Sequence, residues 1–207
     1  MAGDTSSFRR LRTGTSVHEV ADHCREAAFD LLSGASASWG RAELDAWMAG
    51  PYQRATGYAA KGRASATARW SRGAARGAGE VGVEATVLEA RRQLLESLRD
   101  CTTFSGLTAM AREMVEAGWV VGVRDGVGSI GYAPVDYPDM PLRERVAALI
   151  ATDYLIRPND YRDLMLCDVC GELSFSWAPV HRGNCADATP ASSGPELVPP
   201  RKVDRTS

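Results

Sequence analysis

The chain has 207 residues, of which 44% are hydrophobic and 24% charged, and its formal net charge is −2. This balance is that of an ordinary soluble protein and argues against collagen-like, coiled-coil and fully disordered classes. No apolar run approaches the ~20 residues of a membrane span, and the N-terminus lacks the apolar region of a secretory signal. We therefore expect a cytoplasmic protein with no membrane partner.

The N-terminal part of the chain is expected to be helical. Residues 1–14 are small, polar and basic, and are interpreted as a flexible arm. A helix should begin after Ser16, because Ser16 and Glu19 have the spacing of a capping box. A second helix is expected over residues 41–49, where the following Gly-Pro pair would end it. Residues 15–49 thus form a helical hairpin, which must pack on another part of the chain to bury both apolar faces.

Residues 50–79 are interpreted as a basic linker, because they contain no acidic residue and many Ala, Gly and Ser. A solvated linker, or a loosely helical segment lying on an acidic partner, is the interpretation that we favour. The alternative is a nucleic-acid-binding strip, in which Tyr52, Tyr58 and Trp70 would stack on bases. The basic side chains available to it are Arg54, Lys61, Arg63, Arg69, Arg72 and Arg76.

Residues 80–185 are expected to form a self-sufficient α+β domain that ends in a small metal-binding unit. Apolar spacing predicts helices over residues 84–99, 106–117 and 141–155. Asp153 falls near the apolar face of the third helix. It is either a buried acid or, as is more common, an acid that caps or pairs at the helix edge.

A β-hairpin is predicted over residues 119–132, where the hydrophobic period changes to two. Asp125-Gly126 suits a tight two-residue turn between its strands. Two helices followed by this hairpin would also fit the end of a winged-helix domain, with residues 106–117 as its DNA-reading helix. That helix carries Arg112 as its single basic residue, so it is poorly equipped for phosphates.

The strongest functional signal is a group of cysteine and histidine residues near the C-terminus. Zinc prefers four soft or borderline ligands in a tetrahedron, and two close pairs let a short segment supply them. Apolar residues on both sides of the first pair predict two strands joined by a Cys-x-x-Cys-Gly turn. The candidate ligands, in the spacing C-x2-C-x10-H-x3-C, are Cys167, Cys170, His181 and Cys185.

Over about 20 residues this pattern resembles the knuckle of zinc-ribbon and rubredoxin-like proteins. The resemblance implies Zn2+ as the cofactor, bound by the four residues named above. It departs from zinc ribbons at the second pair, where those proteins usually have another Cys-x-x-Cys. It also differs from two-Cys, two-His fingers, because Pro179 and Gly183 favour a turn in place of a helix. No nucleic-acid ligand is therefore implied.

Other roles for the cysteines remain open. Cys167 and Cys170 could form a redox pair, although no βαβ unit surrounds them. Disulfides are a further alternative, although five cysteines is an odd number and no export signal accompanies them. Chance placement of unconnected core residues is the third. Cys24 and Cys101 lie on or beside apolar helical stripes and are expected to be packing residues.

The sequence favours a zinc-stabilised, non-catalytic protein that binds a protein partner or regulates one. Four ligands, three of them thiolates, leave no open position and little positive charge to activate a water, so the zinc is expected to be structural. A winged-helix-like DNA-binding regulator and an enzyme of unrecognised type are the alternatives. Residues 186–207 contain four prolines and little apolar surface, and we expect a disordered tail.

Overall fold

A computed structural model describes residues 8–58, 80–100, 104–137, 140–166 and 173–175. Within them the protein is mainly helical with a small three-stranded sheet, in agreement with the α+β class. None of the described helices is long and apolar enough to cross a membrane. The helices are α1 (Val17–Leu32), α2 (Arg41–Trp47), α3 (Gln53–Thr56), α5 (Glu80–Asp100), α6 (Phe104–Glu116) and α7 (Leu142–Ile156), with short helical turns at Gly34–Ser38, Met48–Tyr52 and Asp160–Asp163. The strands are β1 (Arg9–Arg10), β2 (Val120–Arg124), β3 (Ile130–Pro134), β4 (Leu164–Leu166) and β5 (Leu173–Phe175).

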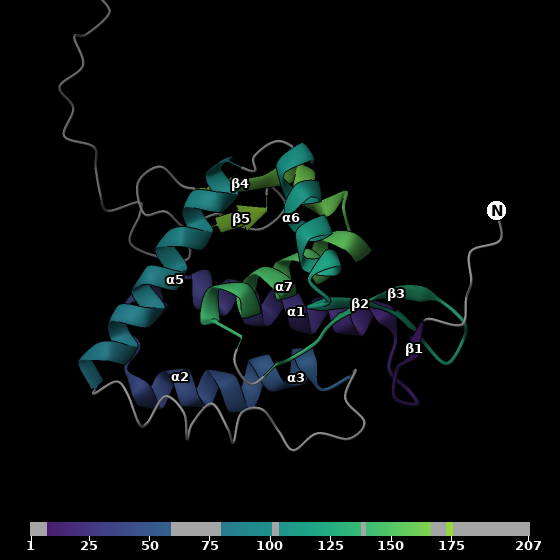
Figure 1. Cartoon of the computed structure of the whole chain (residues 1–207), viewed down its shortest axis with the longest axis horizontal. Coiled ribbons are helices and arrows are strands. Elements are labelled where there is room, and N and C mark those ends of the chain that lie inside the picture. The colour runs from purple at the N-terminus through teal and green to yellow at the C-terminus, as the bar shows by residue number, and fades with distance from the viewer. Residues whose placement is uncertain (1–7, 59–79, 101–103, 138–139, 167–172, 176–207) are drawn as a thin grey trace, which may run out of the picture.

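Helix α7 lies at the centre of the fold, and α1, α5, α6 and β3 pack around it (Figure 1). Its residues are buried without interruption from Arg145 to Tyr154. The sequence predicted one apolar face for this helix, whereas the structure encloses it on every side. A helix surrounded in this way needs small residues that let its neighbours approach, and Ala147, Ala148 and Ala151 provide them.

Helix α1 begins as predicted, with Ser16 as its N-cap. The Ser16 hydroxyl accepts a hydrogen bond from the backbone N–H of Glu19 at 3.1 Å. The apolar face of α1 packs against α7, where Val20 and Cys24 are fully buried. Buried residues of α1, α2, α5, α6 and α7 belong to one hydrophobic core. This arrangement differs from the expected division into a hairpin and a self-sufficient second domain, because α1 covers a face of α7.

The first described residues form part of the sheet, although the sequence placed them in a flexible arm. Strand β1 pairs in parallel with β2, with Arg9 opposite Val123 and Arg10 opposite Arg124. The chain then continues to Leu11, which is buried and donates its N–H to the carbonyl of Arg124 at 2.9 Å. Two arginines have no alternating apolar pattern, so nothing local marks them as a strand.

The helix that was expected to end at Gly50-Pro51 continues through this pair. A π-helical turn, Met48–Tyr52, follows α2 and leads directly into α3. Proline removes a backbone donor and clashes with the carbonyl four residues earlier in a regular α-helix, and the wider π turn relieves this conflict. Burial of Met48, Tyr52 and Ala55, each at most 2% exposed, offsets the remaining cost.

Helices α5 and α6 confirm their predicted positions, extending slightly beyond the expected N-terminal ends. On the exposed side of α5, Arg92 pairs with Glu96 one turn later, with 2.7 Å between Nη1 and Oε1. The chain leaves α6 through Gly118, whose φ of +74° is the left-handed conformation expected just beyond a helix end.

The predicted hairpin is present, but its turn differs from the expected two-residue type. Strands β2 and β3 pair from Val120↔Pro134 to Arg124↔Ile130, which leaves residues 125–129 as the connection. The Asp125 carboxylate accepts hydrogen bonds from the N–H groups of Val127 (3.1 Å) and Ser129 (2.8 Å). Gly128 takes the left-handed position with φ +93°. The side chain of Asp125 thus organises a longer loop than Asp-Gly alone would form.

Gly131 provides a test of the packing between the sheet and α1. A Cβ at this position would lie 2.8 Å from Cγ1 of Val17, whose branched side chain has little freedom to move. We expect Gly131→Ala to lower the free energy of unfolding by about 1–3 kcal/mol, as overpacking does in cores. Gly126→Ala is the matched control, because no atom lies within 4 Å of its added Cβ. Equal urea midpoints for the two variants would contradict this packing.

Candidate functional site

The four candidate zinc ligands, Cys167, Cys170, His181 and Cys185, lie outside the described residues. Among the residues that are described, no group of three or more His, Cys, Asp or Glu side chains could hold a metal ion. The structure does describe the strands that flank the first cysteine pair. Strands β4 and β5 pair antiparallel, with Leu166 opposite Leu173.

Of the basic residues expected to form a nucleic-acid strip, Arg54 lies in the described part of the chain. Its Nη2 is 2.8 Å from Oε1 of Glu26 on α1, and both side chains are about half exposed. The charge of Arg54 is therefore locally compensated by α1. Lys61, Arg63, Arg69, Arg72 and Arg76 lie outside the described residues.

A buried carboxylate, that of Asp153, lies where α1, α7 and the turn at Asp160–Asp163 meet. Asp153 is fully buried. Its Oδ2 accepts hydrogen bonds from Nε of Arg25 and from the hydroxyl of Tyr161, each at 2.7 Å. Its Oδ1 accepts from Nε of Arg157 at 2.9 Å and from Nη2 at 2.6 Å. Asp153 is thus a buried, fully engaged acid.

Two further carboxylates complete the charge balance around the two arginines. Arg25 Nη2 lies 2.7 Å from Oδ2 of Asp160, and Arg157 Nη1 pairs with Asp22. Each guanidinium therefore bridges the buried Asp153 to a more exposed acid. The cluster connects α1 and α7 to the turn that leads directly into β4, and so anchors the base of the β4–β5 pair on the helical core.

Burial and the charge of Asp153 set the ionisation of the groups around it. Burial disfavours the charged form of Arg25, but the hydrogen bond and the charge of Asp153 outweigh this and raise its pKa. Burial, reinforced by Asp153, raises the pKa of Tyr161 and of the Cys24 thiol. Cys24 is therefore a neutral packing residue, as the sequence predicted.

A second buried charge, Arg145 on α7, holds the segment that connects β3 to α7. Arg145 is fully buried, and its Nε and Nη2 donate to the carbonyls of Met140 (2.8 Å) and Tyr137 (2.7 Å). Its Nη1 pairs with Asp136 and donates to the hydroxyl of Tyr52 at 3.0 Å. In the sequence, Arg145 shares the apolar face of its helix, and this is the signal that could have marked it as buried.

His23 of α1 contacts Tyr58, which lies just beyond the end of α3. Its Nδ1 hydrogen-bonds with the Tyr58 hydroxyl, and the two rings are stacked with centroids 5.7 Å apart. The same hydroxyl donates to Oε1 of Glu19 at 3.5 Å. Burial, followed by the charge of Glu19, raises the pKa of Tyr58 to about 12. These contacts fix the last described residue before position 59.

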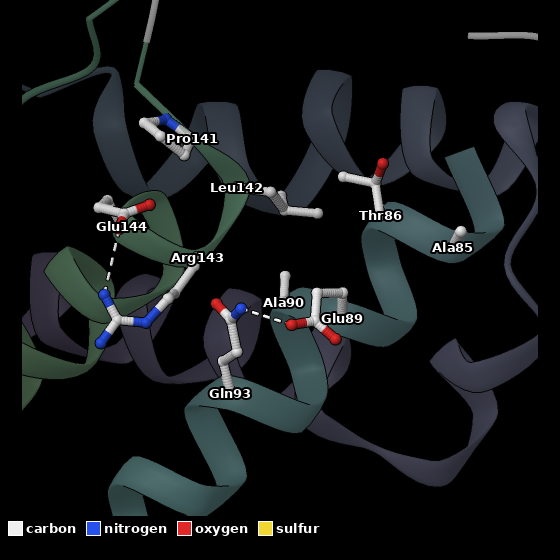
Figure 2. Close-up of a pocket in the computed structure, with 9 residues that line it drawn as sticks. All are labelled: Ala85, Thr86, Glu89, Ala90, Gln93, Pro141, Leu142, Arg143 and Glu144. Carbon is white, nitrogen blue, oxygen red and sulfur yellow. Dashed lines mark hydrogen bonds and ion pairs between the residues drawn. The ribbon is translucent and has the colours of Figure 1, made fainter. Parts of the chain in front are cut away.

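A groove lies between α5 and the start of α7 (Figure 2). Its volume is about 480 Å³. Its polar side chains contact partners on their own wall: Gln93 donates to Glu89 at 2.5 Å, and Arg143 pairs with Glu144 at 3.1 Å. Glu144 Oε2 is buried without a hydrogen-bond partner among the described residues. The lining residues are Ala85, Thr86, Glu89, Ala90 and Gln93 of α5 and residues 141–144.

Comparisons with family models, with curated proteins and with solved structures found no match to this chain.

The role of Asp153 can be measured by neutralising it. In Asp153→Asn the guanidinium groups of Arg25 and Arg157 lose their common counter-charge. The new amide NH2 also meets an N–H or O–H donor where the carboxylate oxygen accepted a hydrogen bond. We expect the free energy of unfolding to fall by about 3 kcal/mol, as when one partner of a buried ion pair is removed. Chemical denaturation at pH 7 measures this loss.

Asp22→Asn is the control, because Asp22 pairs with the same Arg157 but is 65% exposed. We expect it to cost about 1 kcal/mol or less, as exposed ion pairs do. An Asp153→Asn protein as stable as the Asp22→Asn protein would show that the buried cluster is not needed for stability.

Proposed function

We propose that this chain is a zinc-stabilised protein that binds a protein partner or regulates one, with Zn2+ held by Cys167, Cys170, His181 and Cys185. The observation that carries the proposal is the antiparallel pairing of β4 with β5 on either side of the first cysteine pair. The C-x2-C-x10-H-x3-C spacing supplies the four ligands.

The strand register supports a local site for the first two thiolates. Leu166 and Leu173 are paired, so six residues must connect two neighbouring strand ends. Cys167 and Cys170 both belong to this connection, together with Gly171. Two thiolates in so short a connection can share one metal with Zn–S distances of about 2.3 Å. The expectation of two strands joined at the Cys-x-x-Cys-Gly turn is consistent with this register.

The anchoring of β4 supports a structural role for the metal. The turn at Asp160–Asp163 precedes β4. In this turn Tyr161 donates to Asp153 of α7, and Asp160 accepts from Arg25 of α1. The hairpin thus starts from a fixed position on the core. Zinc would hold its far end. A zinc ion with four protein ligands provides a rigid surface in place of a reacting centre, and for this reason we favour binding over catalysis.

The described structure does not favour α6 as a DNA-reading helix. Leu107, Ala111 and Met114 of α6 are buried in the core. Its exposed side presents Arg112 next to Glu113 and Glu116. Two acids beside one base give this face no positive potential with which to bind phosphates.

Metal analysis of the purified full chain tests the proposal. We expect about one zinc ion per chain, and we expect Cys170→Ser to lose it, because three remaining ligands bind zinc far more weakly. Hydrogen exchange should then accelerate in residues 164–166 and 173–175 while the amides of α7 stay protected.

Cys24→Ala is the matched cysteine control, because Cys24 is buried in the helical core and is not one of the candidate zinc ligands. It should keep its zinc even if it loses some stability. The proposal is wrong if the wild type contains no metal, or if Cys170→Ser and Cys24→Ala retain the same amount.

A further inference from the structure

The outer face of the three-stranded sheet carries a group of arginines and aromatic residues that is separate from the proposed zinc site. The strand order β1-β2-β3 and its register place Arg10, Arg124 and Ile130 side by side in one row across the sheet. The neighbouring row holds Gly122 opposite Tyr132. Phe8 covers Gly122, since a Cβ there would lie 2.6 Å from its ring atoms.

The other face of the same sheet packs on the helices. Val123 and Ala133 are fully buried, and Gly131 contacts Val17 of α1. Side chains alternate between the two faces of a strand, so the row with Arg10 and Arg124 points away from the helical core. In Figure 1 the sheet lies at the opposite end of the molecule from α5. We call Phe8, Arg10, Arg124, Ile130 and Tyr132 the outer sheet face.

Among the residues that the structure describes, no acidic side chain neutralises the arginines of the outer sheet face. Arg10 and Arg124 are directly paired across the strands, a placement that is unfavourable for like charges. In the described part of the chain neither forms an ion pair, and Nε of Arg124 is buried without a hydrogen-bond partner. Other described arginines do have acidic partners: Arg25, Arg41, Arg54, Arg92, Arg143, Arg145 and Arg157.

Acidic residues are scarce around this face. Over residues 8–16 and 120–134 the single acid is Asp125. Its carboxylate is turned toward the backbone N–H groups of its own loop. Arg9 and Arg12 are exposed next to Arg10 in the chain and add positive charge to this end of the molecule, although Arg9 belongs to the opposite face of its strand. The end of the molecule formed by this sheet thus offers an anion several arginines and no competing exposed acid on its strands.

Aromatic and aliphatic groups accompany the arginines. Phe8, which covers Gly122, and Tyr132, which is paired with Gly122 across the strands, are both partly exposed, although Tyr132 also packs against the hydrophobic core. Ile130 is 52% exposed, and Val127 in the adjoining loop is 90% exposed. Arginines on an open sheet with neighbouring rings combine the two contacts that an unpaired nucleotide needs: phosphate pairing and base stacking.

We propose that the outer sheet face binds single-stranded nucleic acid, with Arg10 and Arg124 contacting phosphates and Phe8 and Tyr132 stacking on bases. A base-paired duplex would offer phosphates to the arginines but keep its bases from the rings. The rings in the row beside the arginines therefore favour single strands. This proposal is independent of the zinc site.

Fluorescence anisotropy of the full chain with a labelled 12-nucleotide oligodeoxythymidine in 50 mM salt tests it. We expect Arg10→Gln/Arg124→Gln to weaken binding at least tenfold, and the slope of log Kd against log salt to fall by about 1.4, because two phosphate contacts are lost. Phe8→Leu keeps an apolar contact on Gly122 but removes the stacking ring, and should weaken binding about fivefold or more.

Arg92→Gln/Arg112→Gln removes the same number of charges from α5 and α6 and should bind like the wild type. All four proteins keep residues 59–79, so the basic segment contributes equally to each. Failure of the wild type to bind, or equal affinities for the two double variants, would overturn the proposal. It would also be overturned if a 12-base-pair duplex bound as tightly with no effect of Phe8→Leu. Binding to phosphatidylserine vesicles, with none to the oligonucleotide, would assign the face to a membrane instead.

Discussion

The Asp153 carboxylate joins three parts of the chain that no local signal connects. It lies on the central helix, and its partners come from α1, from the end of α7 and from the turn before β4. A carboxylate without solvent is tolerated only when its oxygens are saturated and its charge is balanced. Two arginines and one tyrosine meet both conditions, and each arginine reaches a second acid nearer the surface. The relative positions of α1, α7 and the β4–β5 pair depend on this cluster.

The burial of α7 makes such a cluster necessary. With helices and a sheet on all sides, any polar residue on α7 must find its partner inside the protein. Asp153 and Arg145 are the two charged residues within its buried run, and both are engaged with neighbouring elements. Arg145 fixes the approach to α7, and Asp153 fixes its exit. The helix is thus held at each end by charge and along its length by apolar contacts.

Local sequence signals predicted the elements well and their connections less well. The cap at Ser16, the helices α5 to α7 and the two strands of the hairpin follow from spacing alone. Strand β1 was missed because its two arginines acquire strand geometry only through pairing with β2. The helical path through Pro51 was missed because the stabilising burial of Tyr52 comes from tertiary packing. Asp153 was recognised as a possible buried acid, but its partners lie too far along the chain for periodicity to identify them. The four zinc ligands stay a prediction, supported by the strands on either side of the first pair.

The pairing of β1 with β2 also covers part of a strand edge that would otherwise be exposed. Without β1, the residues Val120–Arg124 would present a free strand edge, with three valines and open backbone donors and acceptors. Such an edge is a template for pairing with another chain, and hence for aggregation. A strand of only two residues covers this edge at Val123 and Arg124, and its two arginines repel a second copy that approaches from the same side. Removal of the N-terminal residues through Arg9 should therefore cause self-association before it disrupts the helical core.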